Sequence, residues 1–483
     1  MKRIAAATLL VLLSTSATAL AAATPEEAKR LTGVFQAYLG SDPGVVTVTP
    51  RDDSYAATVD FAPLFAKIRE PGVSISLSPI QWTLTDRGGG KWQVDQDQPL
   101  SFAFKAEGKL DMKGSIGAIT GTGIFDEALG AFASTATDYR QFAYDQTMTE
   151  SGVTTKASYT VAAMRSETAL SGNGHSADGT AKWTYSDLRE TIAMTMAPGM
   201  PPMAMDVAIA SPGGSQDVII KGLKPKPFNE LIAWLVARPA WAAIVAEQAA
   251  LKDKLRAALP IFANVSGIAA LKELSVNTMM GKFAIAKLDV LVDMNGIVAD
   301  GALREKFTIT GLQLPAGIVP PWAAGLAPTN FTIDFSVAGF NLAAPAALIL
   351  DNLDLAKEPP LPKTIEPQLL QALLPSGAVK IALGASEAIA KIFDLKADGS
   401  MTVGPAAMPQ GTATVKLKGI DEIMAALQAA PPEMGMQQAT PVIIVAKGMA
   451  KQEPDGYLSW KIESTPTGGV TVNGVDPSKM GGQ

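Results

Sequence analysis

The feature that most constrains the fold of this chain is an alternation of apolar and polar residues with a period of two. Residues 73–77 read VSISL and, after Pro79, residues 80–85 read IQWTLT. Because successive side chains of a strand point to opposite faces of a sheet, this period predicts half-buried antiparallel strands. The alternation recurs at 288–292, before an Asn295-Gly296 hairpin turn, and at 331–337, 413–417, 458–462 and 470–472.

Helical signals are fewer. Thr24, Pro25 and Glu27 form a capping box before apolar residues at helical spacing, and Gly40 ends this predicted helix. Further helices are predicted at 228–236 and 241–255, separated at Pro239, at 364–374 and 420–429, and around Phe125–Phe132. The predicted fold class is therefore α+β and β-rich, with long antiparallel sheets whose one apolar face is partly covered by amphipathic helices.

The length of 483 residues predicts more than one folding unit. A Pro- and Met-rich stretch at 194–205 and the segment 221–227 indicate a boundary near residue 225. We expect an N-terminal β-rich domain with a leading helix at 24–225 and a C-terminal α+β domain at 226–483. Both begin with helix and continue into strands, which suggests that the second is a degenerate repeat of the first.

The first 23 residues have the parts of a secretory signal. Lys2 and Arg3 give a positive start, residues 4–13 are apolar, and small residues at 17–23 offer a cleavage site. The apolar run is about half of the roughly 20 residues that span a membrane. We expect residues 1–23 to be a cleaved signal peptide, the mature protein to be periplasmic, and no transmembrane span to remain. An uncleaved anchor is the alternative.

The composition limits the class of partner. Hydrophobic residues make up 47% of the chain and charged residues only 18%. The net charge of −6 becomes −8 when Lys2 and Arg3 are removed with the signal. Nucleic acid is excluded as a partner because phosphate binding needs clustered positive charge. The same acidity argues against adhesion to anionic headgroups, so any lipid contact is expected through acyl chains.

Recognisable catalytic chemistry is scarce. The chain has no cysteine, and its single histidine, His175, lies in a glycine-rich stretch typical of a hairpin tip. A catalytic triad or a zinc site needs more such residues, and no phosphate-binding glycine loop is present. We therefore predict no catalytic residue, no cofactor and no metal. A hydrolase that uses a carboxylate pair remains an alternative, because 46 acidic residues allow many pairs.

One methionine cluster is a candidate site. Thioether sulfur binds Cu(I), so a weak copper site is one interpretation, but an adaptable apolar lid over a groove is favoured. Met434 and Met436, in the segment 431–440, suggest the same adaptable use. The residues of the cluster are Met194, Met196, Met200, Met203 and Met205.

Two stretches resemble known bacterial envelope proteins. One begins at Leu255 and reads LRAALPIFANVSGIAALKELSVNTMMGKFAIAKLDVLVDMNG, and the other, Gly456–Gly474, reads GYLSWKIESTPTGGVTVNG. They resemble the β-rich AsmA-like proteins and related proteobacterial families catalogued as domains of unknown function. The resemblance covers the C-terminal half and rests on alternation patterns. It implies a periplasmic β-rich protein of envelope homeostasis and carries over no catalytic residue.

The sequence therefore favours a non-enzymatic periplasmic protein of envelope homeostasis that contacts lipid or another lipophile through an apolar sheet face. A periplasmic scaffold that binds an envelope protein is the first alternative, and a carboxylate-based hydrolase is the second. A groove in the apolar face would favour lipid, whereas a flat patch with unpaired strand edges would favour the scaffold.

Overall fold

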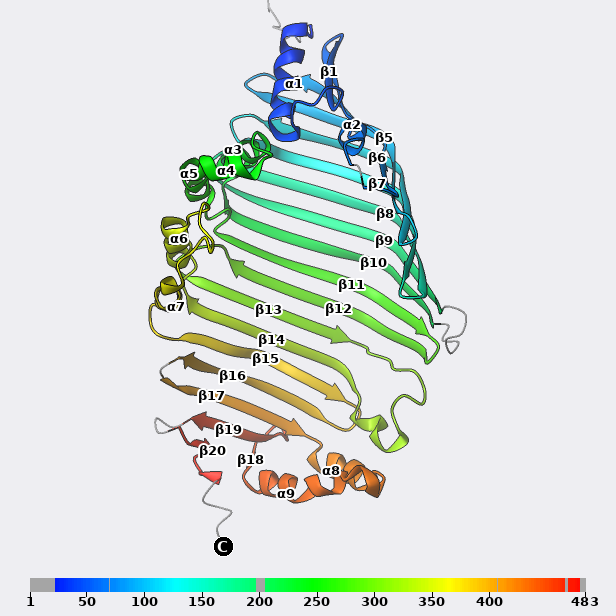
Figure 1. The fold of residues 1–483 in the computed structure, drawn as a ribbon. Helices are drawn as coiled ribbons and strands as arrows, with labels where there is room; N and C mark the ends of the chain where they lie inside the picture. The colour runs from blue at the N-terminus through cyan, green and yellow to red at the C-terminus, as the bar shows by residue number, and fades with distance from the viewer. Residues whose placement is uncertain (1–21, 69, 197–204, 406, 465–467, 478–483) are drawn as a thin grey trace, which may run out of the picture.

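The computed structural model describes residues 22–68, 70–196, 205–405, 407–464 and 468–477. The predicted signal peptide, 1–23, therefore lies almost wholly outside the described residues, as do Met200 and Met203 of the methionine cluster. The described chain forms an elongated molecule, with its N-terminal helix at one end and its last strands and helices at the other (Figure 1).

A single antiparallel sheet dominates the molecule, and the twenty strands of the described residues all belong to it. From β4 to β17 each strand pairs with the next strand in sequence. At one end β2 pairs with β1 and β4, and β3 pairs with β5; at the other, β19 pairs with β17, β18 and β20.

Every segment in which alternation predicted a strand lies in a strand, so the β-rich fold class is confirmed. The strands are β1 (Val46–Arg51), β2 (Ser54–Val59), β3 (Val73–Leu77), β4 (Ile80–Asp86), β5 (Lys91–Ala106), β6 (Leu110–Asp126), β7 (Ala131–Glu150), β8 (Val153–Asn173), β9 (Ser176–Met196), β10 (Met205–Leu223), β11 (Asn264–Thr278), β12 (Gly281–Asn295), β13 (Gly301–Thr310), β14 (Pro328–Phe340), β15 (Val379–Ala390), β16 (Asp394–Gly404), β17 (Ala407–Lys418), β18 (Lys451–Gln452), β19 (Leu458–Ser464) and β20 (Val470–Val472).

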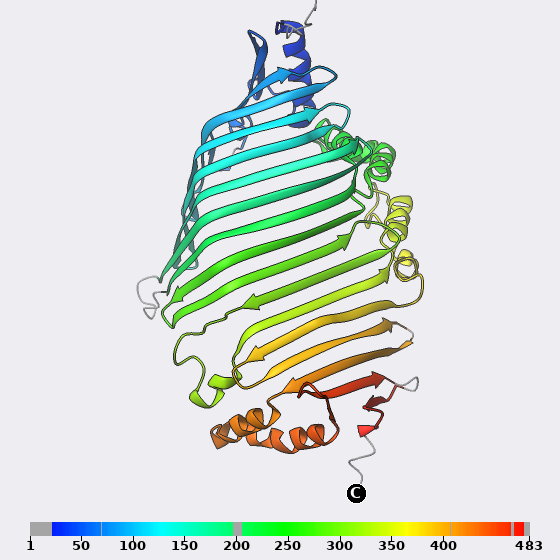
Figure 2. The ribbon, with the colours of Figure 1, turned by 180° about the vertical axis from the view of Figure 1, so that it is seen from behind.

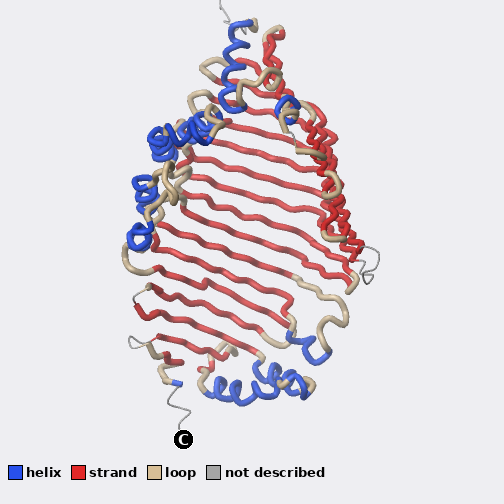
Figure 3. The backbone as a smooth tube through the Cα atoms, viewed as in Figure 1, coloured by secondary structure: helices blue, strands red, loops and turns tan. Residues whose placement is uncertain are grey.

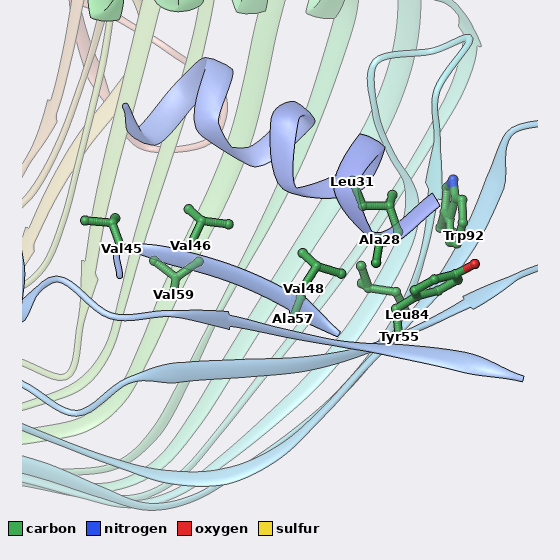
Figure 4. Packing of buried hydrophobic residues seen from close by; sticks show 10 residues of the cluster. All are labelled: Ala28, Leu31, Val45, Val46, Val48, Tyr55, Ala57, Val59, Leu84 and Trp92. Carbon is green, nitrogen blue, oxygen red and sulfur yellow. The ribbon is translucent and has the colours of Figure 1, made fainter. Parts of the chain in front are cut away.

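The first helix, α1 (Pro25–Leu39), forms as its capping residues predict. The backbone N–H of Glu27 donates to Oγ1 of Thr24 over 3.2 Å, and Gly40 ends the helix with a φ of 84°. The helix packs on the first strands of the sheet and forms the hydrophobic core of this end (Figure 4). The buried residues of this core are Ala28, Leu31, Val45, Val46, Val48, Tyr55, Ala57, Val59, Leu84 and Trp92.

Most of the remaining helices form a row along one set of strand ends, at the left of Figure 1 and in blue in Figure 3. Ion pairs join neighbours in this row: Arg238 with Glu247 over 2.6 Å, and Arg256 with Asp351 over 2.8 Å. The row consists of α3 (Pro225–Val236), α4 (Trp241–Ala246), α5 (Gln248–Ala258), α6 (Ala343–Asn352), η2 (Lys363–Ile365) and α7 (Glu366–Leu373).

A second group of helices lies at the C-terminal end of the sheet (Figures 1 and 2). It consists of α8 (Ile420–Gln428), η3 (Pro432–Met434), η4 (Met436–Ala439) and α9 (Thr440–Gly448). Two short elements, α2 (Ala62–Phe65) and η1 (Pro321–Leu326), complete the helices of the described residues. The helices predicted at 228–236, 241–255, 364–374 and 420–429 are confirmed, although α4 and α5 divide the second of these.

The helix predicted around Phe125–Phe132 is wrong. Strand β6 ends at Asp126, whose carboxylate accepts the backbone N–H groups of Ala128 and Leu129, and β7 begins at Ala131. These hydrogen bonds close a tight turn, so the apolar residues on either side face each other across a hairpin instead of along a helix. The rings of Phe125 and Phe132 pack edge to face with centroids 5.5 Å apart.

The predicted boundary at residue 225 falls at the start of α3. Strands β10 and β11, on either side of it, pair along their length, from Ala208 with Asn277 to Lys221 with Asn264. One sheet therefore runs through both predicted halves, and the division of the chain into two domains stays a prediction about its folding units.

A line of irregular positions crosses the sheet from β6 to β12, and we call it the crease. At this line one pair is missing between consecutive strands, or two between β10 and β11, while the register on either side of the gap is the same, and Gln141, Asp187 and Glu273 adopt φ values of 55°, 49° and 47°. Such bulges bend strands and increase twist, and Figure 2 shows that the strands bend. Residues that flank the crease on one face are three apart instead of two: Ile116 and Ile119, Tyr139 and Phe142, Val161 and Met164, Tyr185 and Leu188, Ser211 and Gly214, Leu271 and Leu274, and Ile285 and Leu288.

Candidate functional site on the apolar face of the sheet

Direct register partners on antiparallel strands carry their side chains on the same face, so the pairing defines each face of the sheet. One row of partners can be followed from β2 to β20, and we call the face that carries it the apolar face. In order, the row is Tyr55, Leu84, Val94, Gly123, Thr135, Thr168, Ala181, Val218, Gly267, Val292, Glu305, Phe335, Leu383, Gly399, Ala413, Ile462 and Val472.

The apolar face continues on the other side of the crease. The nearest row there consists of Leu100, Ile116, Phe142, Val161, Leu188 and Ser211. Beside it, the rings of Tyr144 and Tyr159 stack with centroids 5.4 Å apart, and Phe142 meets Tyr159 edge to face at 5.8 Å. Burial among these rings raises the pKa of Tyr159, with smaller contributions from Tyr185 and Glu190. The crease thus changes the phase of the alternation without interrupting the apolar face.

The opposite face is mainly polar, with Ile219 and Ile268 as exposed exceptions. One of its rows consists of Asp138, Arg165, Thr184, Ser215, Ala270, Asp289, Thr308, Thr332, Glu387, Lys396, Lys416 and Ser459. Arg165 pairs with Asp138 over 2.7 Å, and Arg304 makes a two-pronged contact with Asp334 at 2.9 and 2.7 Å. The hydrogen bond from Arg304 holds the pKa of the Asp334 carboxyl below its ordinary value. The predicted division into one apolar and one polar face is confirmed.

Helix α1 covers the apolar face at its N-terminal end. Leu31 is only 5% exposed, as is Trp92 on β5 beneath the helix. The ring of Phe35 stacks on Trp82 of β4 with centroids 6.0 Å apart. Here the apolar side chains of the sheet have protein partners and form an ordinary core.

Helices α8 and α9 cover the same face at the C-terminal end, but less tightly. A hollow of about 370 Å³ remains between these helices and the sheet. Its lining is apolar and consists of Val415, Leu417, Ile420, Ile423, Ile443, Ala446, Met449, Trp460, Ile462 and Val472. Nε1 of Trp460 donates to the carbonyl of Ala446 over 2.7 Å, which fixes α9 to β19.

Between the two covered ends, large apolar side chains of the same face are exposed. Phe335, Leu383 and Met401 are 38%, 36% and 41% exposed. They border a second hollow of about 400 Å³ on strands β14–β17, β19 and β20, whose apolar lining also includes Ile381, Ala413, Val415, Ile462 and Val470. Val415 and Ile462 line both hollows, so the two adjoin on one surface. Contiguous exposed apolar surface of this kind marks a binding site more often than a structural accident.

The polar face carries the acidic residues that a carboxylate mechanism would use. A hollow of about 570 Å³ on β2 and β4–β8 is bordered by Asp95, Asp97 and Asp138. Asp138 is paired with Arg165, and Asp95 accepts hydrogen bonds from Thr122 and Gln93. Hydrogen bonds and ion pairs of this kind are what a solvated polar sheet face supplies.

Three residues of the methionine cluster lie at the adjacent ends of β9 and β10. Met194 and Met196 belong to β9 and Met205 begins β10 as the register partner of Met194, while Met200 and Met203 lie outside the described residues. Register places Met194 on the apolar face, next to Thr155 of β8. The lid and the copper site therefore both remain predictions.

Two features of the site were not predicted from the sequence. Helix α9 was not predicted, although its apolar run, VIIVA at 442–446, follows the helix-compatible start Thr440-Pro441. The crease was not predicted either, although apolar residues spaced by three within a longer alternation, such as Tyr139 and Phe142, are its signal.

Residues 242–465 match the model of a family described as an uncharacterised protein conserved in bacteria, a domain of unknown function (DUF2125). The match begins in α4 and ends after β19, so it includes the residues that line both apolar hollows except Val470 and Val472 of β20. It supports the predicted kinship with domains of unknown function, but not the finer resemblance to AsmA-like proteins. No curated protein and no solved structure matches the chain. In the described part of the chain, no helix is long and apolar enough to cross a membrane.

Proposed function

We propose that this chain is a non-enzymatic periplasmic protein of envelope homeostasis that binds lipid or another lipophile on the apolar face of its sheet. The observation that carries the proposal is the apolar hollow of about 400 Å³ beside the exposed Phe335, Leu383 and Met401. Its volume lies within the roughly 300–1,000 Å³ typical of small-ligand sites.

The chemistry of the lining supports an acyl chain as the bound group. Aliphatic and aromatic side chains border the hollow. Polar residues such as Ser400 and Thr412 also border it, because each is next in sequence to a residue whose side chain lies on the apolar face. Transfer of apolar surface from water contributes roughly 25 cal/mol per Å² and needs no directed polar contact. The periplasmic location follows from the predicted signal and is part of the proposal.

The test is to express the chain with its own N-terminal segment, purify it from the periplasm, and analyse it by native mass spectrometry followed by solvent extraction. The expected result is a lipophile bound in a near-stoichiometric amount. Met401→Glu should abolish this binding, because it places a charge at the border of the hollow.

Thr402→Glu is the matched control, since Thr402 is the neighbouring exposed residue on the polar face of β16. It should bind as much lipophile as the wild type. A wild-type protein without bound lipophile, or equal binding by the two variants, would contradict the proposal. A protein partner would then be the favoured alternative, and crosslinking would be used to find it.

A further inference from the structure

The outer side of α9 carries exposed aliphatic residues that its position in the fold does not explain. Val442, Ile444 and Val445 are 70%, 57% and 54% exposed, whereas Ile443 and Ala446 of the same helix line the hollow of about 370 Å³. A helix at a protein surface normally carries polar residues on its outer side. Helix α9 is apolar on both sides, so its outer side is suited to a second apolar environment.

Neighbouring residues extend this surface. Met434 and Met436, in the turns that precede α9, are 48% and 38% exposed. We call Met434, Met436, Val442, Ile444 and Val445 the α9 patch. Helix α9 lies at the C-terminal end of the elongated molecule, away from α1 (Figure 1).

The charges around the patch favour a lipid surface. No acidic residue occurs between Glu433 and Glu453, and the segment contains two lysines: Lys447, and Lys451, which pairs with Glu453 over 3.6 Å. A membrane interface disfavours carboxylates and tolerates lysines, whose long side chains reach the headgroups. Lys447 also donates to Asp421 of α8 over 2.6 Å, which holds α9 in place.

The residue types argue against a protein partner. Segment 434–452 contains no Trp, Tyr or Arg, the residue types most enriched among the hot spots of protein interfaces, and its exposed apolar side chains are Val, Ile and Met. Apolar insertion into the boundary of a bilayer needs only aliphatic area.

We infer that the α9 patch docks the C-terminal end of the molecule on a lipid bilayer. Helix α9 borders both the patch, on its outer side, and the apolar hollow of about 370 Å³, on its inner side. The inference rests on the proposed function. Its evidence comes from the residues of the α9 patch, none of which lines the hollow of about 400 Å³.

The first experiment is flotation of the purified full chain with vesicles of phosphatidylethanolamine and phosphatidylglycerol. The triple variant Val442→Ser, Ile444→Ser and Val445→Ser should float roughly tenfold less than the wild type, since most of the inserted area is lost. The double variant Met279→Ser, Met280→Ser is the matched control, because these methionines are 73% and 67% exposed but lie in the turn between β11 and β12. It should float like the wild type.

A second measurement uses the absence of cysteine from the chain. A polarity-sensitive dye on Val445→Cys should shift to the blue when vesicles are added, and the same dye on Met279→Cys should not. Unchanged circular dichroism establishes that each variant is folded.

The outcomes separate this inference from the proposed function. Met401→Glu should lose its bound lipophile and still float, while the triple variant should keep its lipophile and fail to float. Failure of the wild type to float, or flotation of the triple variant at the wild-type level, would overturn the docking inference alone. A wild-type dimer that the triple variant converts to a monomer would assign the patch to a second copy instead.

Discussion

The N-terminal end and the centre of the sheet present the same apolar face, but only one of them is covered. At the N-terminal end α1 reduces the exposure of Leu31 and Trp92 to 5%, whereas Phe335 in the centre is 38% exposed. Both regions have the alternation of a half-buried strand. The comparison shows that alternation determines which face is apolar, while a helix elsewhere in the chain determines whether that face is a core or a surface.

The largest effect should come from the covered end. Leu31→Ala should lower the free energy of unfolding by about 3 kcal/mol, because it removes a buried side chain and leaves a cavity. Val34→Ala, on an exposed side of the same helix, should cost about 0.5 kcal/mol or less. Urea unfolding followed by circular dichroism measures both, and equal losses would mean that α1 is not packed on the sheet as described.

A smaller loss is expected on the polar face behind the uncovered centre. Arg304→Ala should cost about 2 kcal/mol, because it leaves the Asp334 carboxylate, with a side chain only 7% exposed, without its guanidinium partner. The loss is less than for a fully buried pair because the Arg304 side chain is 51% exposed. The same urea experiment tests this, and Arg304→Ala combined with Asp334→Asn should recover part of the loss.

Acid should weaken this pair next. The pKa of Asp334 is lowered in the folded protein by the hydrogen bond from Arg304, so its contribution to stability is complete above its unfolded pKa, about 3.9, and is lost as the pH falls through the folded pKa. The free energy of unfolding should therefore fall with pH below about 4, and less steeply in Asp334→Asn. Urea midpoints measured from pH 5 downwards decide this, and identical slopes would refute it.

The smallest change in stability is expected at the uncovered centre. Phe335→Ala should cost about 1 kcal/mol or less, because the ring is partly in water already. It should nevertheless reduce the bound lipophile detected by native mass spectrometry, since the ring borders the hollow. A loss as large as that of Leu31→Ala would show that this part of the face is covered, and would remove the contrast between the two regions.

Much of the fold could be predicted from local sequence. The capping box at Thr24 and Glu27 specifies where α1 begins, and the alternation at 413–417 specifies the two faces of β17. Both signals depend on residues close together in the chain. The turn after Asp126 was mistaken for helix because its apolar neighbours, Phe125 and Phe132, meet across a hairpin, which spacing alone does not reveal.

The site was harder to predict for two physical reasons. In β7 the alternation of apolar and polar residues shifts by one position between Tyr139 and Phe142. A search for one period of two along the whole strand therefore finds only a weak signal, because the two halves of the strand are out of phase. Coverage depends on contacts distant in sequence, such as that of Phe35 with Trp82 and that of Trp460 with Ala446. The sequence could therefore predict an apolar face, but not which part of it would stay open.

The order of the strands has a consequence for the size of the protein. From β4 to β17 each strand pairs with the next in sequence, and strands joined by tight turns, such as β5 with β6 and β7 with β8, form self-contained hairpins. Removal or insertion of one hairpin leaves neighbours that still run antiparallel and still present the same face. The span of the apolar face can thus change in whole hairpin units, as solenoid proteins change length by whole repeats, while the helices that close its two ends stay the same.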